Sequence, residues 1–145
     1  MVSLCAVGDV CVNRDSPESA FAFSSSVINE ADIAFCQLET IYSERGAPSL
    51  LAGHPLRAHP RNVSALKFAG FDVVSMAGNH VLDWGDDALI DTIEALECNN
   101  IRVVGAGQNL AEARKPVIVV RKKVRIAFLA YNSILPHRYW AETNK

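Results

Sequence analysis

Apolar runs of a few residues alternate with polar, glycine-containing turns along this chain, and their branched residues are typical of buried strands. The run that starts at Phe71 is the clearest, because Val73 and Val74 stand at its centre and glycines stand at either end. It is too short for an ordinary helix. We predict buried strands at residues 2–7, 32–38, 71–77 and 101–104.

Segments between these runs have the apolar spacing and the terminal residues of helices. Pro17 is typical of the first turn of a helix, and Gly70 is typical of the left-handed residue that ends one. The side chains of Asn62, and of Asp86 or Asp87, are predicted to cap two helices. The predicted helices cover residues 16–28, 62–69, 86–98 and 110–114, and their alternation with strands indicates an α/β fold.

The remaining segments are predicted to be one hairpin and one long loop. Two apolar runs, 117–120 and 124–131, enclose a basic turn, and a β-hairpin with a solvated tip is the simplest account of them. Glycines and prolines recur through residues 43–60, which are therefore predicted to be a loop. Loops of this length are commonly functional or mobile.

Composition and charge place the chain in the class of single globular domains. It has 145 residues, of which 50% are hydrophobic and 21% are charged, enough to bury one core. A net charge of −2 and a pI near 6.1 leave no basic face for a phosphate backbone, so we expect no nucleic-acid partner. The four cysteines contain no C-x-x-C pair and favour a reducing compartment.

No apolar stretch approaches the length of a membrane span, and no secretory signal precedes the first predicted strand. We therefore expect a soluble chain without a membrane segment. Two locations remain open at this point. The chain could be cytoplasmic, or it could be an excised portion of a membrane-anchored extracytoplasmic protein.

Polar side chains follow three of the predicted strands at the point where each strand ends. Asp9 follows the first strand, Glu39 the second, and Asn79 with His80 the third, while Asp83 comes one short turn later. Ligands of open α/β sheets bind outside the carboxyl ends of the strands, so we expect these side chains to share one site. The alternative for Asp9 or Glu39 taken alone is a cap or turn residue.

Side chains of this kind suit hydrolysis assisted by a divalent cation such as manganese, iron, magnesium or zinc. The cation would activate a water molecule, and His80 could then protonate the leaving group. Asp83 could orient the imidazole of His80, whose alternative role is that of a structural histidine satisfied by Asp83. Arg57, in the predicted loop, could contact an anionic substrate or remain solvated.

Several of these residues form a pattern that resembles a known family. Its most specific part is the string Gly-Asn-His-x-x-Asp-x-Gly at residues 78–85, accompanied by Gly8-Asp9-Val10 with Arg14, by Leu38-Glu39 and by residues 104–107. Together these strings resemble the bacterial capsule-synthesis family CapA, also called the poly-γ-glutamate synthesis PgsA type, over nearly the whole chain. That family is similar to calcineurin-like metallophosphoesterases, which implies a layered αββα sandwich with a two-metal site.

The resemblance implies a metal-dependent hydrolase linked to capsule or poly-γ-glutamate biosynthesis. Its substrate would be a phosphoester or an amide in an acidic polymer, and its cofactor a divalent metal (Mn, Fe, Zn or Mg). By resemblance, the metal ligands are Asp9, Glu39 and Asn79, and His80 is the leaving-group acid. We further predict Asp83 as a second catalytic residue and Arg14 and Arg57 as substrate-binding residues.

The chain departs from the metallophosphoesterase pattern at several positions. Cys11 stands where the first motif has a histidine, Glu39 where the second has an aspartate, and Gln37 where this family commonly has an asparagine. Metallophosphoesterases complete their sites with later histidines, whereas only His137 follows the predicted hairpin. We therefore expect an incomplete, weak and open site, with the metal absent or partly bound in this chain.

Residues 1–145 are expected to form about the N-terminal half of a metallophosphoesterase-like α/β sandwich, with a mixed sheet, flanking helices and a C-terminal hairpin. Members of the family continue with a second sheet, and without it one apolar face would be exposed. We therefore expect the chain either to lack its C-terminal half or to form a homo-oligomer.

Two further functions are alternatives to hydrolysis. A non-catalytic accessory protein in polymer assembly would use the same cleft to hold the polymer or a partner protein. Nucleotide binding through Gly105-Ala106-Gly107 is disfavoured, because Leu110 stands where the third glycine of the fingerprint is needed. A tight turn from strand to helix explains these glycines better.

Overall fold

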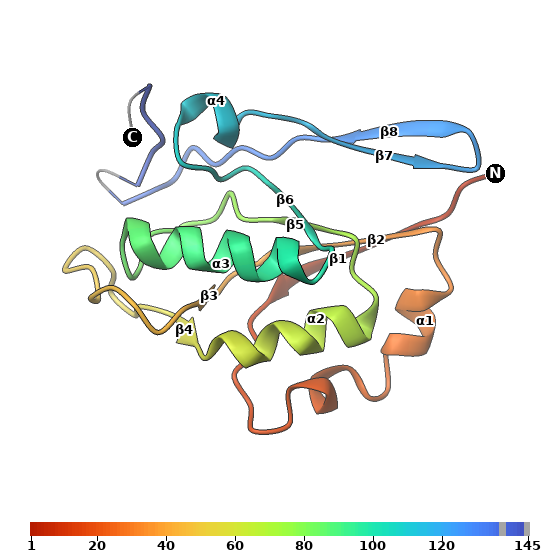
Figure 1. The fold of residues 1–145 in the computed structure, drawn as a ribbon, viewed down its shortest axis with the longest axis horizontal. Coiled ribbons are helices and arrows are strands. Elements are labelled where there is room, and N and C mark those ends of the chain that lie inside the picture. Colours follow the sequence, from red (N-terminus) through yellow and green to blue (C-terminus); the bar gives the residue numbers. More distant parts are fainter. Residues whose placement is uncertain (137–138, 144–145) are drawn as a thin grey trace.

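A computed structural model of the chain describes residues 1–136 and 139–143. Its centre is a four-stranded parallel sheet with the strand order β1-β2-β5-β6 (Figure 1). Because all four strands run in the same direction, their carboxyl ends lie at one edge of the sheet. The strands are β1 (Leu4–Val10), β2 (Ile33–Leu38), β5 (Val73–Ser75) and β6 (Arg102–Val104).

Helices cover the face of the sheet that is lower in Figure 1. Cys36 and Val74 of the sheet share one hydrophobic core with Leu66 and Leu96, which come from the two longest helices. Burying one such aliphatic side chain stabilises a fold by about 1.5–3 kcal/mol. The helical elements are η1 (Pro17–Phe21), α1 (Ser25–Asn29), η2 (Pro60–Asn62), α2 (Val63–Ala69), α3 (Asp86–Cys98) and α4 (Leu110–Ala113).

A hairpin formed by β7 (Val117–Arg121) and β8 (Val124–Phe128) lies over the opposite face of the sheet. Val119 is fully buried there in a second hydrophobic cluster, and Phe128 stacks on Phe35 with 5.5 Å between the ring centroids. The sheet is therefore covered on both faces. This explains why its strands are nearly continuous apolar runs in the sequence.

The predicted α/β class, flanking helices and C-terminal hairpin are confirmed. The two strand directions occur in separate sheets, since the four central strands are parallel and only the hairpin is antiparallel. Gly70 ends α2 in the left-handed conformation, with φ of 89°, as predicted. Strand β1 continues to Val10. Asp9 is therefore a paired residue near the end of the strand rather than a residue that follows it.

The predicted helix over residues 16–28 is wrong. The segment forms two short pieces, η1 and α1, and Phe23 between them is 99% exposed. Its apolar side chain was counted toward a buried helical face that does not exist. Without a continuous apolar face to bury, the intrinsic helix propensity of the segment does not stabilise a single helix.

The predicted side-chain caps are also wrong. Asn62 makes no capping bond, and its Oδ1 instead accepts a hydrogen bond of 2.9 Å from the backbone N–H of Arg14. Gly85, rather than Asp86 or Asp87, is the residue before α3, and the two aspartates occupy the first helical turn. There they favour the helix by their charge, because the N-terminus of a helix carries partial positive charge.

The predicted loop at residues 43–60 contains some regular structure. Its strand β4 (Arg57–Ala58) pairs in parallel with β3 (Ile41–Tyr42). Arg45 of the loop forms an ion pair with Asp91 of α3, and this guanidinium holds the pKa of Asp91 below its ordinary value. Two separate attachments therefore hold the loop against the body of the domain.

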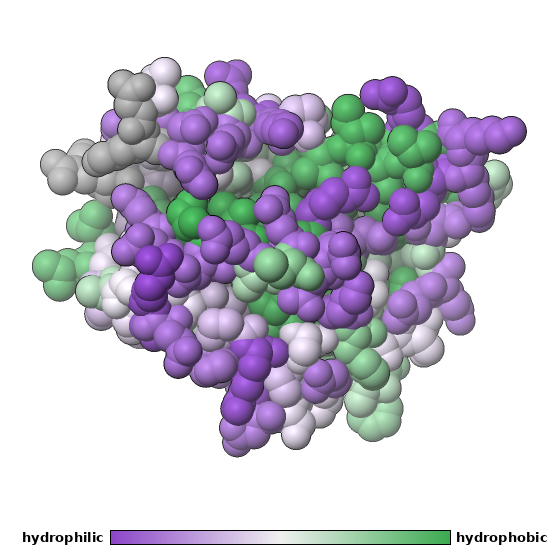
Figure 2. Space-filling model, in the orientation of Figure 1, coloured by the Kyte–Doolittle hydropathy of each residue, from purple (hydrophilic) through white to green (hydrophobic). Residues whose placement is uncertain are grey.

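Apolar side chains remain on the surface along the hairpin, toward the upper right of Figure 2. Ile118 is 42% exposed, Val120 55% and Leu129 56%, and all three point away from the buried side of the hairpin. The predicted exposed face belonged to the central sheet, which is covered on both sides, so the exposed apolar side chains lie along the hairpin instead. Within the described residues, no helix has the length and apolarity needed to cross a bilayer.

Candidate functional site

Neighbouring strands deliver the predicted site residues to the carboxyl edge of the sheet. Asp9 of β1 pairs with Gln37 of β2, and the backbone N–H of Glu39 donates a 3.0 Å hydrogen bond to the carbonyl oxygen of Val10. A bulge between Ala6 and Asp9 shifts the register of β1 at this point. The side chain of Asp9 is exposed at the edge of the sheet.

His80 lies between two carboxylates. Its Nδ1 is 2.6 Å from Oδ2 of Asp83, and its Nε2 is 4.0 Å from Oε1 of Glu39. The His80 side chain is 19% exposed and that of Glu39 33%, so both side chains are partly accessible to solvent. The structure therefore brings together His80, Asp83 and Glu39, as predicted from the sequence.

Asp83 is the most deeply buried member of the site, with 1% of its surface exposed. The oxygen that faces His80 also accepts a 2.7 Å hydrogen bond from the backbone N–H of Leu56. The backbone carbonyl of Asp83 accepts a 2.7 Å bond from the N–H of Ser49. Asp83 therefore attaches the 43–60 loop to the turn that carries His80.

Arg57 occupies a small hollow beside this turn. Its guanidinium lies 4.4 Å from the centre of the Trp84 ring, a distance at which a cation–π interaction is favourable. A cavity of about 210 Å³ adjoins it, with Asn13, Glu44 and His59 among the lining residues. The Nε2 atom of His59 is 3.6 Å from a carboxylate oxygen of Glu44.

Arg14 and Asn79 are less closely joined to the site. Arg14 is exposed, and its recorded contact is the backbone bond to Asn62 rather than a bond from its guanidinium. Asn79 is exposed in the turn that precedes His80. The roles predicted for both residues stay predictions.

Metal ligation by Asp9, Glu39 and Asn79 also stays a prediction. Over residues 1–136 and 139–143, no three His, Cys, Asp or Glu side chains are gathered as a metal ion would require. These donors have suitable chemistry for a hard cation, but they do not form a closed set. His137, the one histidine after the hairpin, lies outside the described residues.

Tyr139 is a neighbour of the site that sequence reasoning missed. Tyr139 is 6% exposed, and this burial raises the pKa of its hydroxyl. The negative charge of Asp83 raises the same pKa further. Tyr139 belongs to a stretch without periodicity, so no local pattern indicates its burial. The contacts of Ser49 and Leu56 with Asp83 were missed for a related reason, since they use backbone atoms that every residue carries.

Comparison with known proteins extends these observations. A family model described as bacterial capsule synthesis protein PGA_cap matches residues 3–145. A probable polyglutamine synthesis accessory protein of Mycobacterium tuberculosis is 34% identical over 113 residues, covering 76% of this chain and 30% of that protein. Capsule biosynthesis protein CapA of Bacillus anthracis is 37% identical over 76 residues, covering 52% of this chain and 18% of that protein.

Protein y4sH of Sinorhizobium fredii is 29% identical over 136 residues, covering 88% of this chain. This chain spans 30% of the length of that protein and the same share of the Mycobacterium protein. The matched relatives are therefore about three times as long as the chain.

Proposed function

The chain belongs to the bacterial capsule synthesis protein family, and from this premise we propose that it acts on an acidic polymer during capsule or poly-γ-glutamate biosynthesis. The proposed reaction is hydrolysis, with His80 transferring a proton to the leaving group. The alternative substrate, by similarity to metallophosphoesterases, is a phosphoester. Both substrates are anionic, so the same cationic surroundings would serve either.

The observation that carries this proposal is the position of His80 between Asp83 and Glu39. The buried carboxylate of Asp83 holds Nδ1, which fixes the orientation of the ring and directs Nε2 toward the partly exposed carboxylate of Glu39. A histidine oriented by a buried carboxylate is the usual arrangement for proton transfer.

One cationic group beside the turn that carries His80 supports an anionic substrate. Arg57 is held over Trp84, the residue that follows Asp83. Stacking on the indole restricts the guanidinium while leaving its N–H groups available. A carboxylate of the polymer would bind this guanidinium, and the bond to be cleaved would lie beside His80.

A divalent metal would supply an activated water molecule if Asp9, Glu39 and Asn79 held one. The described residues do not gather a closed set of donors, so no step of this mechanism is assigned to a metal. The step assigned to this chain is the proton transfer at Nε2 of His80. Asp83 stabilises the charged ring while it carries the proton.

Hydrolysis is tested by incubating the chain with poly-γ-glutamate and, separately, with p-nitrophenyl phosphate, each with and without Mn²⁺. New amino termini or released nitrophenol measure the two reactions. Because general acid catalysis contributes about 10²–10⁴-fold to a rate, His80→Gln should reduce the rate at least about 100-fold. His54→Gln, which changes an exposed histidine of the loop, is the control and should retain the rate. An equal rate in His80→Gln would refute the proposal.

A non-catalytic accessory role is the second candidate. The Mycobacterium relative carries the word accessory in its name, and the described donors do not form a closed metal site. This role predicts that the chain binds poly-γ-glutamate without cleaving it. Arg57→Gln should then weaken binding, whereas His80→Gln should leave it unchanged. Binding without product in either assay would favour this role over hydrolysis.

A further inference from the structure

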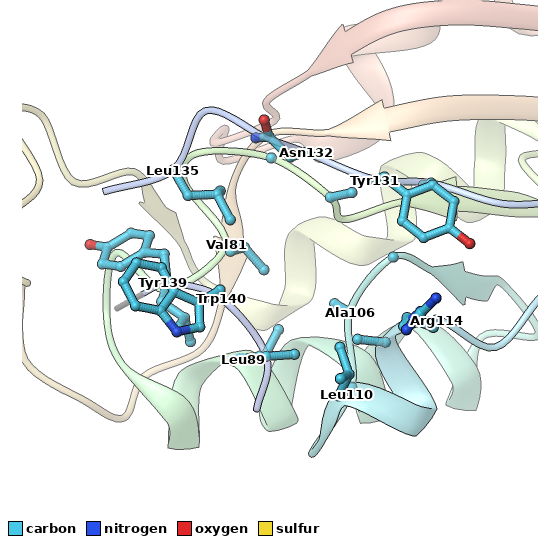
Figure 3. Close-up of a pocket in the computed structure, with 18 of the residues that line it drawn as sticks. Val81, Leu89, Ala106, Leu110, Arg114, Tyr131, Asn132, Leu135, Tyr139 and Trp140 are labelled. Carbon is cyan, nitrogen blue, oxygen red and sulfur yellow. The ribbon is translucent and has the colours of Figure 1, made fainter. Parts of the chain in front are cut away.

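A larger cavity, of about 520 Å³, lies on the other side of the turn that carries His80 (Figure 3). Its walls come from α3, from α4, from the turns that follow β5 and β6, and from the segment after β8. A volume of this size is typical of sites for small organic molecules. Leu89 and Leu110 lie along one side of it, and Leu135 and Trp140, which follow β8, also line it.

This cavity is not the candidate catalytic site. Asp9, Glu39, Asn79 and His80 are absent from its lining, although Gly78 and Val81 on either side of the last two contribute to it. The turn therefore presents His80 toward Glu39 and apolar atoms toward the cavity. The two sites share a wall but no proposed reacting group.

The glycine-rich turn in this cavity is not built to bind a phosphate. Gly105 has φ of 86°, and a Cβ there would lie 2.7 Å from that of Ala77, so the glycine serves close packing. The N–H of Gln108 donates to the carboxylate of Glu112 at 2.9 Å, and the N–H of Glu112 donates to Oδ1 of Asn109 at 3.0 Å. These amides are already paired, which removes the usual means of holding a nucleotide.

Among the described residues that line it, the cavity offers an apolar interior and one cation, at its rim. Arg114, at the end of α4, lies near Tyr131 at the opposite end of the cavity from Trp140 (Figure 3). Within residues 1–136 and 139–143, the Arg114 guanidinium takes part in no recorded ion pair. Asp86 also lines the cavity, but it sits in the first turn of α3, where the helix dipole offsets its charge.

We propose that this cavity binds a single-chain amphiphile with an anionic head, such as a medium-chain carboxylate. The acyl chain would lie among Leu89, Leu110 and Leu135, and the carboxylate would bind Arg114. Burial of the chain supplies most of the affinity, since each methylene removed from water contributes about 0.8 kcal/mol. The guanidinium supplies the preference for a carboxylate over other head groups.

The test uses decanoate, added to the chain below the concentration at which it forms micelles. We expect saturable binding by calorimetry together with a change in tryptophan fluorescence. Because Trp140 lines the cavity and Trp84 lies under Arg57, the fluorescence change should disappear in Trp140→Phe and persist in Trp84→Phe. Decylammonium, which reverses the head-group charge, should bind at least about tenfold more weakly than decanoate.

Arg114→Gln should weaken decanoate binding by about tenfold, while Arg125→Gln on the hairpin should not change it. Arg114 is exposed, so its replacement does not threaten folding. The absence of saturable binding would overturn the proposal, as would equal binding of decanoate and decylammonium. A second copy of the chain is another occupant, and sedimentation of the wild type and of Leu110→Glu tests it. If the wild type forms dimers that the substitution abolishes, and decanoate does not bind, the cavity is a contact surface for a second copy.

Discussion

Oδ2 of Asp83 lies 2.6 Å from Nδ1 of His80 and also accepts the backbone N–H of Leu56 at 2.7 Å. One buried oxygen therefore orients the candidate proton donor and attaches the 43–60 loop. Arg57 belongs to that loop and lies over Trp84. The orientation of His80 and the placement of Arg57 thus depend on the same residue, Asp83.

Replacing Asp83 should disturb both features at once. Asp83→Ala leaves the N–H of Leu56 without its acceptor in a buried place, and we expect a loss of about 1–3 kcal/mol in the free energy of unfolding. Urea unfolding followed by circular dichroism measures the loss. Nitrogen-detected NMR, at a pH where the His80 ring is neutral, should show the proton fixed on Nδ1 in the wild type and distributed between both nitrogens in the variant.

Asp15→Ala is the matched control for this substitution. Asp15 is fully exposed and pairs with Arg61 on the surface, so its removal should change stability by less than about 0.5 kcal/mol. If Asp83→Ala were no more destabilising than Asp15→Ala, the bond to Leu56 would not hold the loop. If the His80 proton distribution stayed the same, Asp83 would not orient the ring.

The sequence predicted the elements whose patterns are local. The strands, the hairpin and the end of α2 at Gly70 depend on runs of a few residues, and each occurs in the structure. The helix over 16–28 failed because Phe23, in its middle, is 99% exposed and has no surface to pack against. Whether an apolar residue is buried depends on distant parts of the chain, which a local pattern does not contain.

The candidate site likewise contains residues that the sequence predicted and residues that it did not. Glu39, His80 and Asp83 were expected to meet, because parallel strands end at one edge and the last two residues are a single turn apart. The attachment of Leu56 and the burial of Tyr139 were not expected. Both depend on how an irregular segment lies on the finished sheet, and neither segment has a periodic pattern.

Acid should weaken the attachment of the N-terminal strand to the hairpin. Asp32 accepts hydrogen bonds from Lys122 at 2.8 Å and from the N–H of Ser3 at 2.9 Å, and these bonds lower the pKa of Asp32 to about 2. A carboxylate whose pKa is lower in the folded state stabilises the fold above its unfolded pKa. This stabilisation is lost as the pH falls from about 4 to about 2.

Asp32→Asn should therefore be less stable than the wild type at neutral pH, and the difference should shrink below pH 4. Thermal unfolding at a series of pH values measures this convergence. Glu97→Gln removes an exposed carboxylate of α3 and should keep the wild-type pH profile. A constant difference between Asp32→Asn and the wild type from pH 7 to about pH 2 would contradict the role given to Asp32.

Gly105 should tolerate no side chain. Its φ of 86° disfavours any L residue, and a Cβ would lie 2.7 Å from that of Ala77 and 2.9 Å from that of Ala130. Gly105→Ala should cost about 1–3 kcal/mol in the free energy of unfolding. Gly53→Ala is the control, because nothing lies within 4 Å of a Cβ there, and it should change stability by less than about 0.5 kcal/mol. Equal stabilities would mean that the turn after β6 relaxes freely.

The outer face of the hairpin should make this chain self-associate. Ile118 and Val120 of β7 expose 42% and 55% of their surfaces, Leu129 just after β8 exposes 56%, and exposed apolar side chains of this kind tend to associate. Sedimentation velocity over a range of concentrations should show oligomers of the wild type. The double variant Ile118→Lys, Val120→Glu should remain monomeric.

Because both replaced side chains already point into solvent, the double variant should keep its unfolding free energy to within about 1 kcal/mol. Phe23→Ser removes a side chain that is 99% exposed on the far side of the sheet, so it should leave the oligomers intact. A sharp wild-type monomer peak at every concentration, with little binding of an apolar dye, would show that this face does not associate. Loss of the oligomers in Phe23→Ser would assign the contact to another surface.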